Sequence, residues 1–169
     1  IRRLSHHAVS MEEAGADIII FTCSSTSPAV DVVRRLVNRP VLKIDEPMAE
    51  DAVKKGRRIG IVATVATTLE PTSQLLKEKA LEVKREISIS TALCEEAFQA
   101  LLQGDTEKHD RMVLEKAKGL SRDVDVLVLA QGSMARLVLP LRRQVSVPVV
   151  SSPTLLMEKL KAMIQTGEG

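Results

Sequence analysis

Short, unbroken apolar runs that alternate with longer amphipathic segments restrict the fold of this chain more than any other feature. The runs DIIIFT, RRIGIVAT, DVDVLVLA and VPVVSS are built around stretches of Val, Ile, Leu and Ala. Unbroken runs of this kind are typical of strands buried on both faces, as in parallel sheets. Segments of helical length separate them, which implies parallel strands joined by right-handed crossovers. The sequence therefore predicts an α/β fold.

The expected elements alternate along the chain as helix and strand. Pro47 marks a helix start, while Gly15 and Gly56 mark helix ends. Strands are expected at residues 17–22, 40–44, 57–64, 85–91, 123–130 and 147–152. Helices are expected up to Gly15, at residues 28–37, 47–56, 68–83 and 132–145, from Pro153 onward, and as a pair divided at Gly104 and Asp105.

The chain also contains an internal repeat. Residues 17–41 align without a gap with residues 125–149, and eight of the 25 positions are identical. The shared residues include an Arg-Arg pair and a Pro-Val pair, which two unrelated apolar strands seldom have at one fixed spacing. In this alignment Cys23 falls opposite Gln131.

The repeat predicts two pseudo-symmetric lobes, each a parallel sheet flanked by helices. We assign residues 1–46 and 149–169 to the first lobe and residues 47–148 to the second. Because α/β sheets bind ligands at the carboxyl ends of their strands, the two equivalent strand-to-helix turns should face each other across an active-site cleft. In the second lobe a strand and a helix precede the repeated unit, so we expect a matching N-terminal strand and loop that is missing before Ile1.

Composition argues against several classes of function. A net charge of +2 and 1% aromatic residues do not suit a nucleic-acid surface. The longest apolar run, residues 126–130, is too short to cross a membrane. No phosphate-binding glycine motif follows a strand, so no cofactor is expected. The two cysteines fit a reducing cytoplasm better than a disulfide framework, and three scattered histidines do not suggest a metal site.

Four segments resemble the aspartate/glutamate/hydantoin racemase superfamily, whose relatives include arylmalonate decarboxylase and maleate isomerase. TCSST, from Thr22, resembles the first Cys-Asn-Thr loop of the racemases, and PVLKIDEP looks like their strand leading to Glu-Pro at the lobe crossover. GIVATVATTLEP is similar to their Gly-Thr-x-Ala-Thr segment, and VLVLAQGSM stands where they carry Gly-Cys-Thr. The resemblance covers essentially the whole chain and implies a cofactor-independent enzyme with two α/β lobes.

The resemblance implies proton transfer at the carbon α to a carboxylate of a small amino acid or related acid. Cys23 would take the proton as a thiolate, the form that a following helix N-terminus favours, and give it as a thiol. Hydroxyls and backbone N–H groups at helix starts would stabilise the enolate-like transition state. Ser24 and Ser25 would hold the substrate carboxylate. The other expected substrate-binding residues are Thr64, Ala66, Thr67, Gln131, Gly132 and Ser133.

Gln131 departs from the two-cysteine pattern of the racemases. A two-base racemase removes a proton on one face of the carbon and delivers one on the other, and an amide cannot act as a base. One alternative is a decarboxylase of a malonate-type acid, in which Cys23 protonates the enolate. Another is a catalytically silent carboxylate-binding protein built on the same lobes. We expect a small carboxylate as the partner and leave a homo-oligomer open.

Three further polar residues are expected to be structural. Cys94 lies on an amphipathic helix, and Glu46 stands at the lobe crossover, where a hinge or a structural hydrogen bond is expected. His109 follows a Gly-Asp helix start, so we expect it to lie at the surface or to cap the helix.

Overall fold

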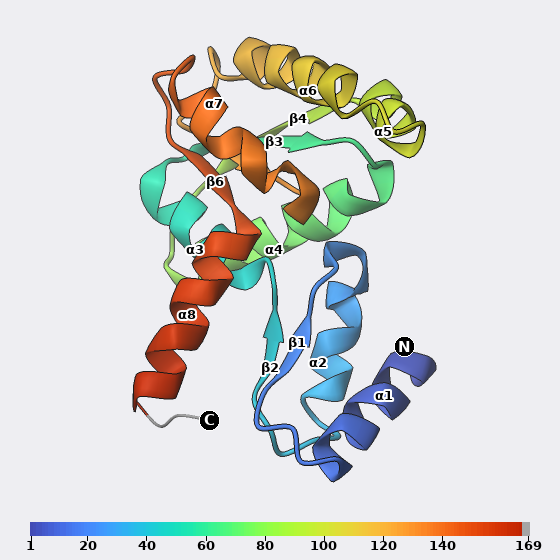
Figure 1. Ribbon diagram of the computed structural model, residues 1–169. Coiled ribbons are helices and arrows are strands. Elements are labelled where there is room, and N and C mark those ends of the chain that lie inside the picture. Colours follow the sequence, from blue (N-terminus) through green and yellow to red (C-terminus); the bar gives the residue numbers. More distant parts are fainter. Residues whose placement is uncertain (167–169) are drawn as a thin grey trace.

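The computed structural model describes residues 1–166, and two parallel sheets organise them (Figure 1). The smaller sheet pairs β1 (Ile19–Phe21) with β2 (Val41–Lys43). The larger sheet has the order β4-β3-β5-β6. Its strands are β3 (Arg58–Ala63), β4 (Ser88–Leu93), β5 (Val126–Leu129) and β6 (Val149–Ser151). All these strand pairs are parallel, which confirms the predicted α/β fold of parallel sheets flanked by helices.

Helices and 3₁₀ turns connect the strands in the expected alternation. In chain order they are α1 (Arg2–Glu13), η1 (Ser24–Ala29), α2 (Val30–Val33), α3 (Glu46–Lys55), η2 (Ala66–Thr68), α4 (Leu69–Glu82), α5 (Glu95–Leu102), α6 (Thr106–Leu120), η3 (Gly132–Leu137), α7 (Val138–Arg142) and α8 (Ser152–Thr166). The helix expected from Pro28 begins four residues earlier, because a 3₁₀ turn starts directly after Cys23 and contains the proline. No helix within residues 1–166 has the length and apolar character needed to span a bilayer.

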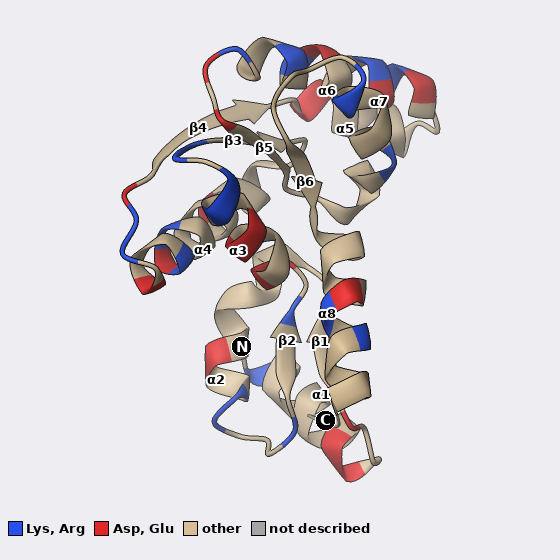
Figure 2. Cartoon of the chain, turned by 90° about the vertical axis from the view of Figure 1, so that its left-hand side faces the viewer, with Lys and Arg blue, Asp and Glu red and all other residues tan. Residues whose placement is uncertain are grey.

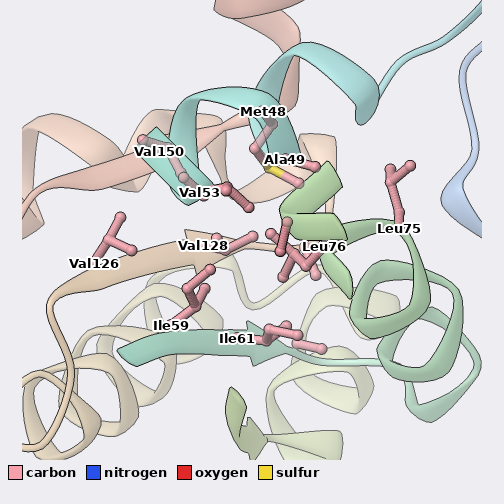
Figure 3. Close-up of a cluster of buried hydrophobic side chains, with 14 residues drawn as sticks. Met48, Ala49, Val53, Ile59, Ile61, Leu75, Leu76, Val126, Val128 and Val150 are labelled. Carbon is pink, nitrogen blue, oxygen red and sulfur yellow. The ribbon is translucent and has the colours of Figure 1, made fainter. Parts of the chain in front are cut away.

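The unbroken apolar runs arise because the larger sheet is covered on both faces. On β5, Val126 and Val128 pack with α3 and α4, while Leu127 and Leu129 pack with α5, α6 and α7. Figure 3 shows the first of these layers, in which Val126 and Val128 lie close to side chains of α3 and α4. Neighbouring residues of β5 thus enter different cores, and both must be apolar.

The smaller sheet has its own core, which α1 and α2 cover. Ile19, Phe21 and Val41 from the strands pack against Ala8 of α1 and Val33 of α2. In Figure 1 these elements lie together below the larger sheet, and the chain passes from β2 into α3.

The end of the chain differs from the expected division into lobes. Residues 149–169 were expected in the first lobe, but β6 pairs with β5 in the larger sheet, with Val149 opposite Leu127. Helix α8 then packs against α3, and residues 167–169 lie outside the described part. The internal repeat gives the physical reason. In it β5 and β6 correspond to β1 and β2, and the two strands of each unit pair with each other. The assignment of residues 149–151 to the first lobe is therefore wrong, because β6 belongs to the larger sheet.

Residues that repeat in the sequence make matching contacts in the structure. The Nη2 of Arg34 donates to the carbonyl oxygen of Val41 at 2.8 Å, and the Nη2 of Arg142 donates to that of Val149 at 3.0 Å. Each arginine therefore fixes the strand that follows its helix. This explains why Arg34 and Arg142 recur at the same spacing from Val41 and Val149.

Candidate active site

Three turns of similar conformation follow the carboxyl ends of β1, β3 and β5. An extended residue begins each turn: Cys23 (φ −129°, ψ 120°), Val65 (φ −130°, ψ 123°) and Gln131 (φ −130°, ψ 136°). A 3₁₀ turn comes next in each case and leads into α2, α4 or α7. The first N–H groups of such turns are free to bind anionic groups, as they are at helix starts.

Cys23 lies exposed at the start of η1 as a free thiol. Its carbonyl oxygen accepts hydrogen bonds from the backbone N–H of Thr26 at 2.9 Å and from the Thr26 hydroxyl at 2.7 Å, which fixes the turn. Cys23 and Thr26 line a pocket of about 320 Å³ whose other walls are β1 and the apolar side of α1. The thiol is therefore accessible to a small ligand.

The two serines after Cys23 lie in different environments. The Ser25 hydroxyl is exposed and lies 3.5 Å from the Thr67 hydroxyl, so η1 and η2 come together there. Ser24 is 7% exposed and lies on the buried side of the turn, near Asp45. Of the two, Ser25 is the one placed to meet a ligand.

Gln131 connects the second and third turns. Its Oε1 accepts from the backbone N–H of Thr64 at 2.6 Å, and its Nε2 donates to the Thr64 hydroxyl at 2.9 Å. Thr64 is buried, with 1% of its surface exposed. The amide that stands opposite Cys23 in the repeat is therefore used in a contact between two strand ends.

The remaining expected site residues are exposed but do not all share one pocket. Gly132 and Ser133 lie at the surface at the start of η3. Ala66 and Thr67 line a pocket of about 470 Å³ together with Thr64 and the first turn of α5, including Glu95 and Glu96. Cys23 opens into the other pocket, and the contact between Ser25 and Thr67 links η1 to η2.

One carboxylate beneath η1 was not among the expected site residues. Asp45, which follows β2, is fully buried and accepts from the Ser27 hydroxyl at 3.2 Å. Burial raises the pKa of Asp45, although hydrogen bonds from Ser24 and Ser27 partly oppose the effect. A charged residue directly after a buried strand is the sequence signal that could have pointed to Asp45.

Glu46 is structural, as expected. Its carboxylate accepts two hydrogen bonds from Arg34, at 3.1 and 2.8 Å. Burial would raise the pKa of Glu46, but the Arg34 guanidinium outweighs burial and lowers it. The pair fastens α2 to the start of α3, where the chain crosses to the larger sheet.

The position of His109 differs from the expected one. It was expected at the surface or as a cap, but it is fully buried, and Asp105 caps α6 by accepting from the backbone N–H of Lys108 at 2.9 Å. Cys94 is half-buried and packs against the core of the larger sheet. Within residues 1–166, His, Cys, Asp and Glu side chains form no group of three or more that could hold a metal ion.

The fold and these three turns define an α/β protein whose candidate ligand site combines a free thiol, hydroxyls and free backbone N–H groups at strand ends. The Asp/Glu/Hydantoin racemase family model matches residues 2–160. The chain therefore belongs to this family of racemases.

Curated relatives support the family at moderate identity. Glutamate racemase from Picosynechococcus sp. is 31% identical over 123 residues, which are 70% of this chain and 43% of that protein. Glutamate racemase from Aquifex pyrophilus is 31% identical over 125 residues, which are 70% of this chain and 47% of that protein. The chain thus matches less than half the length of these relatives.

Solved structures share the fold over nearly the whole chain. Glutamate racemase RacE1 from Bacillus anthracis superposes with a TM-score of 0.74 at 16% identity, covering 98% of this chain and 64% of that one. An aspartate racemase homologue from Pyrococcus horikoshii OT3 gives a TM-score of 0.68 at 25% identity, covering 96% and 73%. Arylmalonate decarboxylase gives 0.64 at 16% identity, covering 94% and 73%.

Proposed function

We propose that this protein is a cofactor-independent racemase or isomerase that transfers a proton at the carbon α to a carboxylate through Cys23. The observation that carries the proposal is the exposed free thiol at the start of η1, in a chain that belongs to the racemase family. The thiolate is the form of cysteine that accepts a proton, and the substrate would be a small amino acid or a related acid. A reducing, cytoplasmic location belongs to the proposal, since both cysteines are free.

The three turns would supply the electrostatic part of the reaction. When the Cys23 sulfur takes the α-proton, the electron pair of the C–H bond moves into the carboxylate and forms an enolate. Backbone N–H groups of the turns, with the hydroxyls of Ser25, Thr67 and Ser133, would stabilise that charge. Ala66 and Gly132 would contribute backbone N–H groups, because their side chains carry no donor.

We further propose that the two sheets belong to pseudo-symmetric lobes and that the substrate binds between them. The matching contacts of Arg34 and Arg142 support the relation between the lobes. The contact between Ser25 and Thr67 supports a site at their junction, because it joins η1, which follows Cys23, to η2, which follows Thr64 and Val65.

Decarboxylation is a second candidate because of Gln131. A second thiol does not stand at this position, and the amide is engaged by Thr64. In decarboxylation of a malonate-type acid, the C–C bond to one carboxylate breaks, carbon dioxide leaves, and Cys23 protonates the enolate. This reaction needs one proton donor, and arylmalonate decarboxylase shares the fold.

A panel of acids in D₂O would test the proposal and separate the alternatives. The complete protein would be incubated with aspartate, glutamate, a hydantoin and an aryl malonate, with NMR detection of deuterium at the α carbon. Exchange without loss of carbon dioxide supports the racemase or isomerase, and loss of carbon dioxide supports the decarboxylase. Binding of an acid by calorimetry with neither reaction would refute both and support a silent carboxylate-binding protein.

A further inference from the structure

Helix α6 carries charged residues of both signs (Figure 2), and a charged cluster joins it to the turn that carries Gln131. Arg136 of η3 donates to both oxygens of Asp110, from Nε at 3.0 Å and from Nη2 at 2.6 Å. The Nδ1 of His109 lies 2.7 Å from Asp110 Oδ1 and 3.2 Å from Arg136 Nη2. The guanidinium of Arg136 and the imidazole of His109 therefore both contact the carboxylate of Asp110 in a defined geometry.

The cluster is more than a surface ion pair. His109 is fully buried, and its Nε2 has no hydrogen-bond partner within the described residues. Burial would raise the pKa of Asp110, but hydrogen bonds from Arg136 and His109 outweigh burial and lower it. Burying an imidazole nitrogen without a partner costs free energy, so packing alone gives no reason to place a histidine here.

The cluster acts on the third strand-end turn. Through Nη1, Arg136 also donates to the carbonyl oxygen of Ser133. The same guanidinium thus holds α6 on one side and the first residues of η3 on the other. In the repeat, Pro28 stands opposite Arg136, and η1 is instead anchored from below by Ser27 and Asp45. The two turns have equivalent positions but different anchors.

We propose that Arg136, oriented by Asp110 and His109, is a positioning residue that sets the geometry of Gln131, Gly132 and Ser133. The inference rests on the proposed function, because it assigns these three residues to the reaction. Arg136 does not serve as the carboxylate-binding cation in this arrangement, since Asp110 already accepts two of its hydrogen bonds. Its effect on the reaction passes through the turn.

Asp110→Asn and Arg136→Gln would test the proposal by a measurement that does not need activity. The Met134 backbone N–H donates to the Gln131 carbonyl oxygen at 3.0 Å, so hydrogen exchange of this amide reports closure of the turn. Both variants should speed its exchange about tenfold relative to core amides of β5. In the proton-transfer assay, kcat should fall about 10- to 100-fold with a smaller change in KM, because the turn is misplaced.

Arg58→Gln is the matched control. Arg58 donates to Asp125 at 2.9 and 2.7 Å, and this Arg–Asp pair lies at the other end of the same sheet. The Arg58→Gln substitution should therefore leave both the Met134 amide exchange and kcat unchanged. If Arg136→Gln does not fold, Arg136→Lys retains the charge and serves instead. An unchanged Met134 amide, even with a lowered melting temperature, would overturn the proposal. If wild type lacks activity, the proposed function fails, and the Met134 amide alone decides whether the cluster positions the turn.

Discussion

Replacing Gln131 with alanine should destabilise the protein through a partner that lies in another turn. The buried N–H of Thr64 donates to Gln131 Oε1 at 2.6 Å, and truncation removes this acceptor. A buried N–H without an acceptor costs about 1–3 kcal/mol. Because Gln131 is itself only half-buried, water can replace part of the lost bond, and we expect a decrease of about 1–2 kcal/mol in the free energy of unfolding.

Gln131→Glu is the informative comparison, because it retains the acceptor for the Thr64 N–H while removing the Nε2 donor. It should lose less stability than Gln131→Ala at neutral pH. Urea unfolding monitored by circular dichroism would give both values, and unchanged m-values would show that the two variants remain compact. Equal stability of wild type and Gln131→Ala within about 0.5 kcal/mol would refute the reasoning, since Thr64 would then not depend on Gln131.

Three further predictions concern charge and the second face of the substrate. Hydrogen bonds from the Arg58 backbone and side chain lower the pKa of Asp125 to about 2, below its usual 3.8. The ionised Asp125 therefore stabilises the folded state above pH 4, and this contribution is lost as the pH falls towards 2. In acid titration, Asp125→Asn should lack this loss of stability. Burial raises the pKa of Asp45, so ionisation of this carboxyl destabilises the folded state as the pH rises. The stability of Asp45→Asn relative to wild type, measured by urea unfolding, should therefore increase from pH 4 to 7. Gln131→Cys should raise the ratio of inversion to deuterium exchange at the α carbon, measured by chiral chromatography, because it adds a base opposite Cys23. An unchanged ratio would count against the proposal that the turns of Cys23 and Gln131 face the same substrate.

The fold could be predicted well because the central strands β3 and β5 are buried on two faces. Val126 and Leu127 are neighbours that enter different cores, and such burial leaves an unbroken apolar run in the sequence. All six expected strands are present, with ends that differ by up to three residues. The pairing of β6 was not predicted, because the periodicity identifies a strand and does not name its neighbour.

Of the candidate site, only the positions of the turns that a motif marks could be predicted. Cys23 and Gln131 stand directly after apolar runs, and both begin strand-end turns as expected. His109 gave no such signal, since its contact with Arg136 involves a residue 27 positions further along the chain. Ser24 was assigned to the ligand on its position in the motif, and this assignment stays a prediction, although the turn buries Ser24 to 7% exposure.

The most direct test of the central claim compares three forms of the complete protein in D₂O. Wild type, Cys23→Ala and Cys94→Ala would be incubated with whichever acid of the panel reacts, and deuterium at the α carbon would be followed by NMR. Cys94 is a suitable control because it is the second free thiol and packs against the core. We expect Cys94→Ala to exchange at a rate close to wild type and Cys23→Ala to lose exchange. Exchange that persists in Cys23→Ala would contradict proton transfer through this thiol.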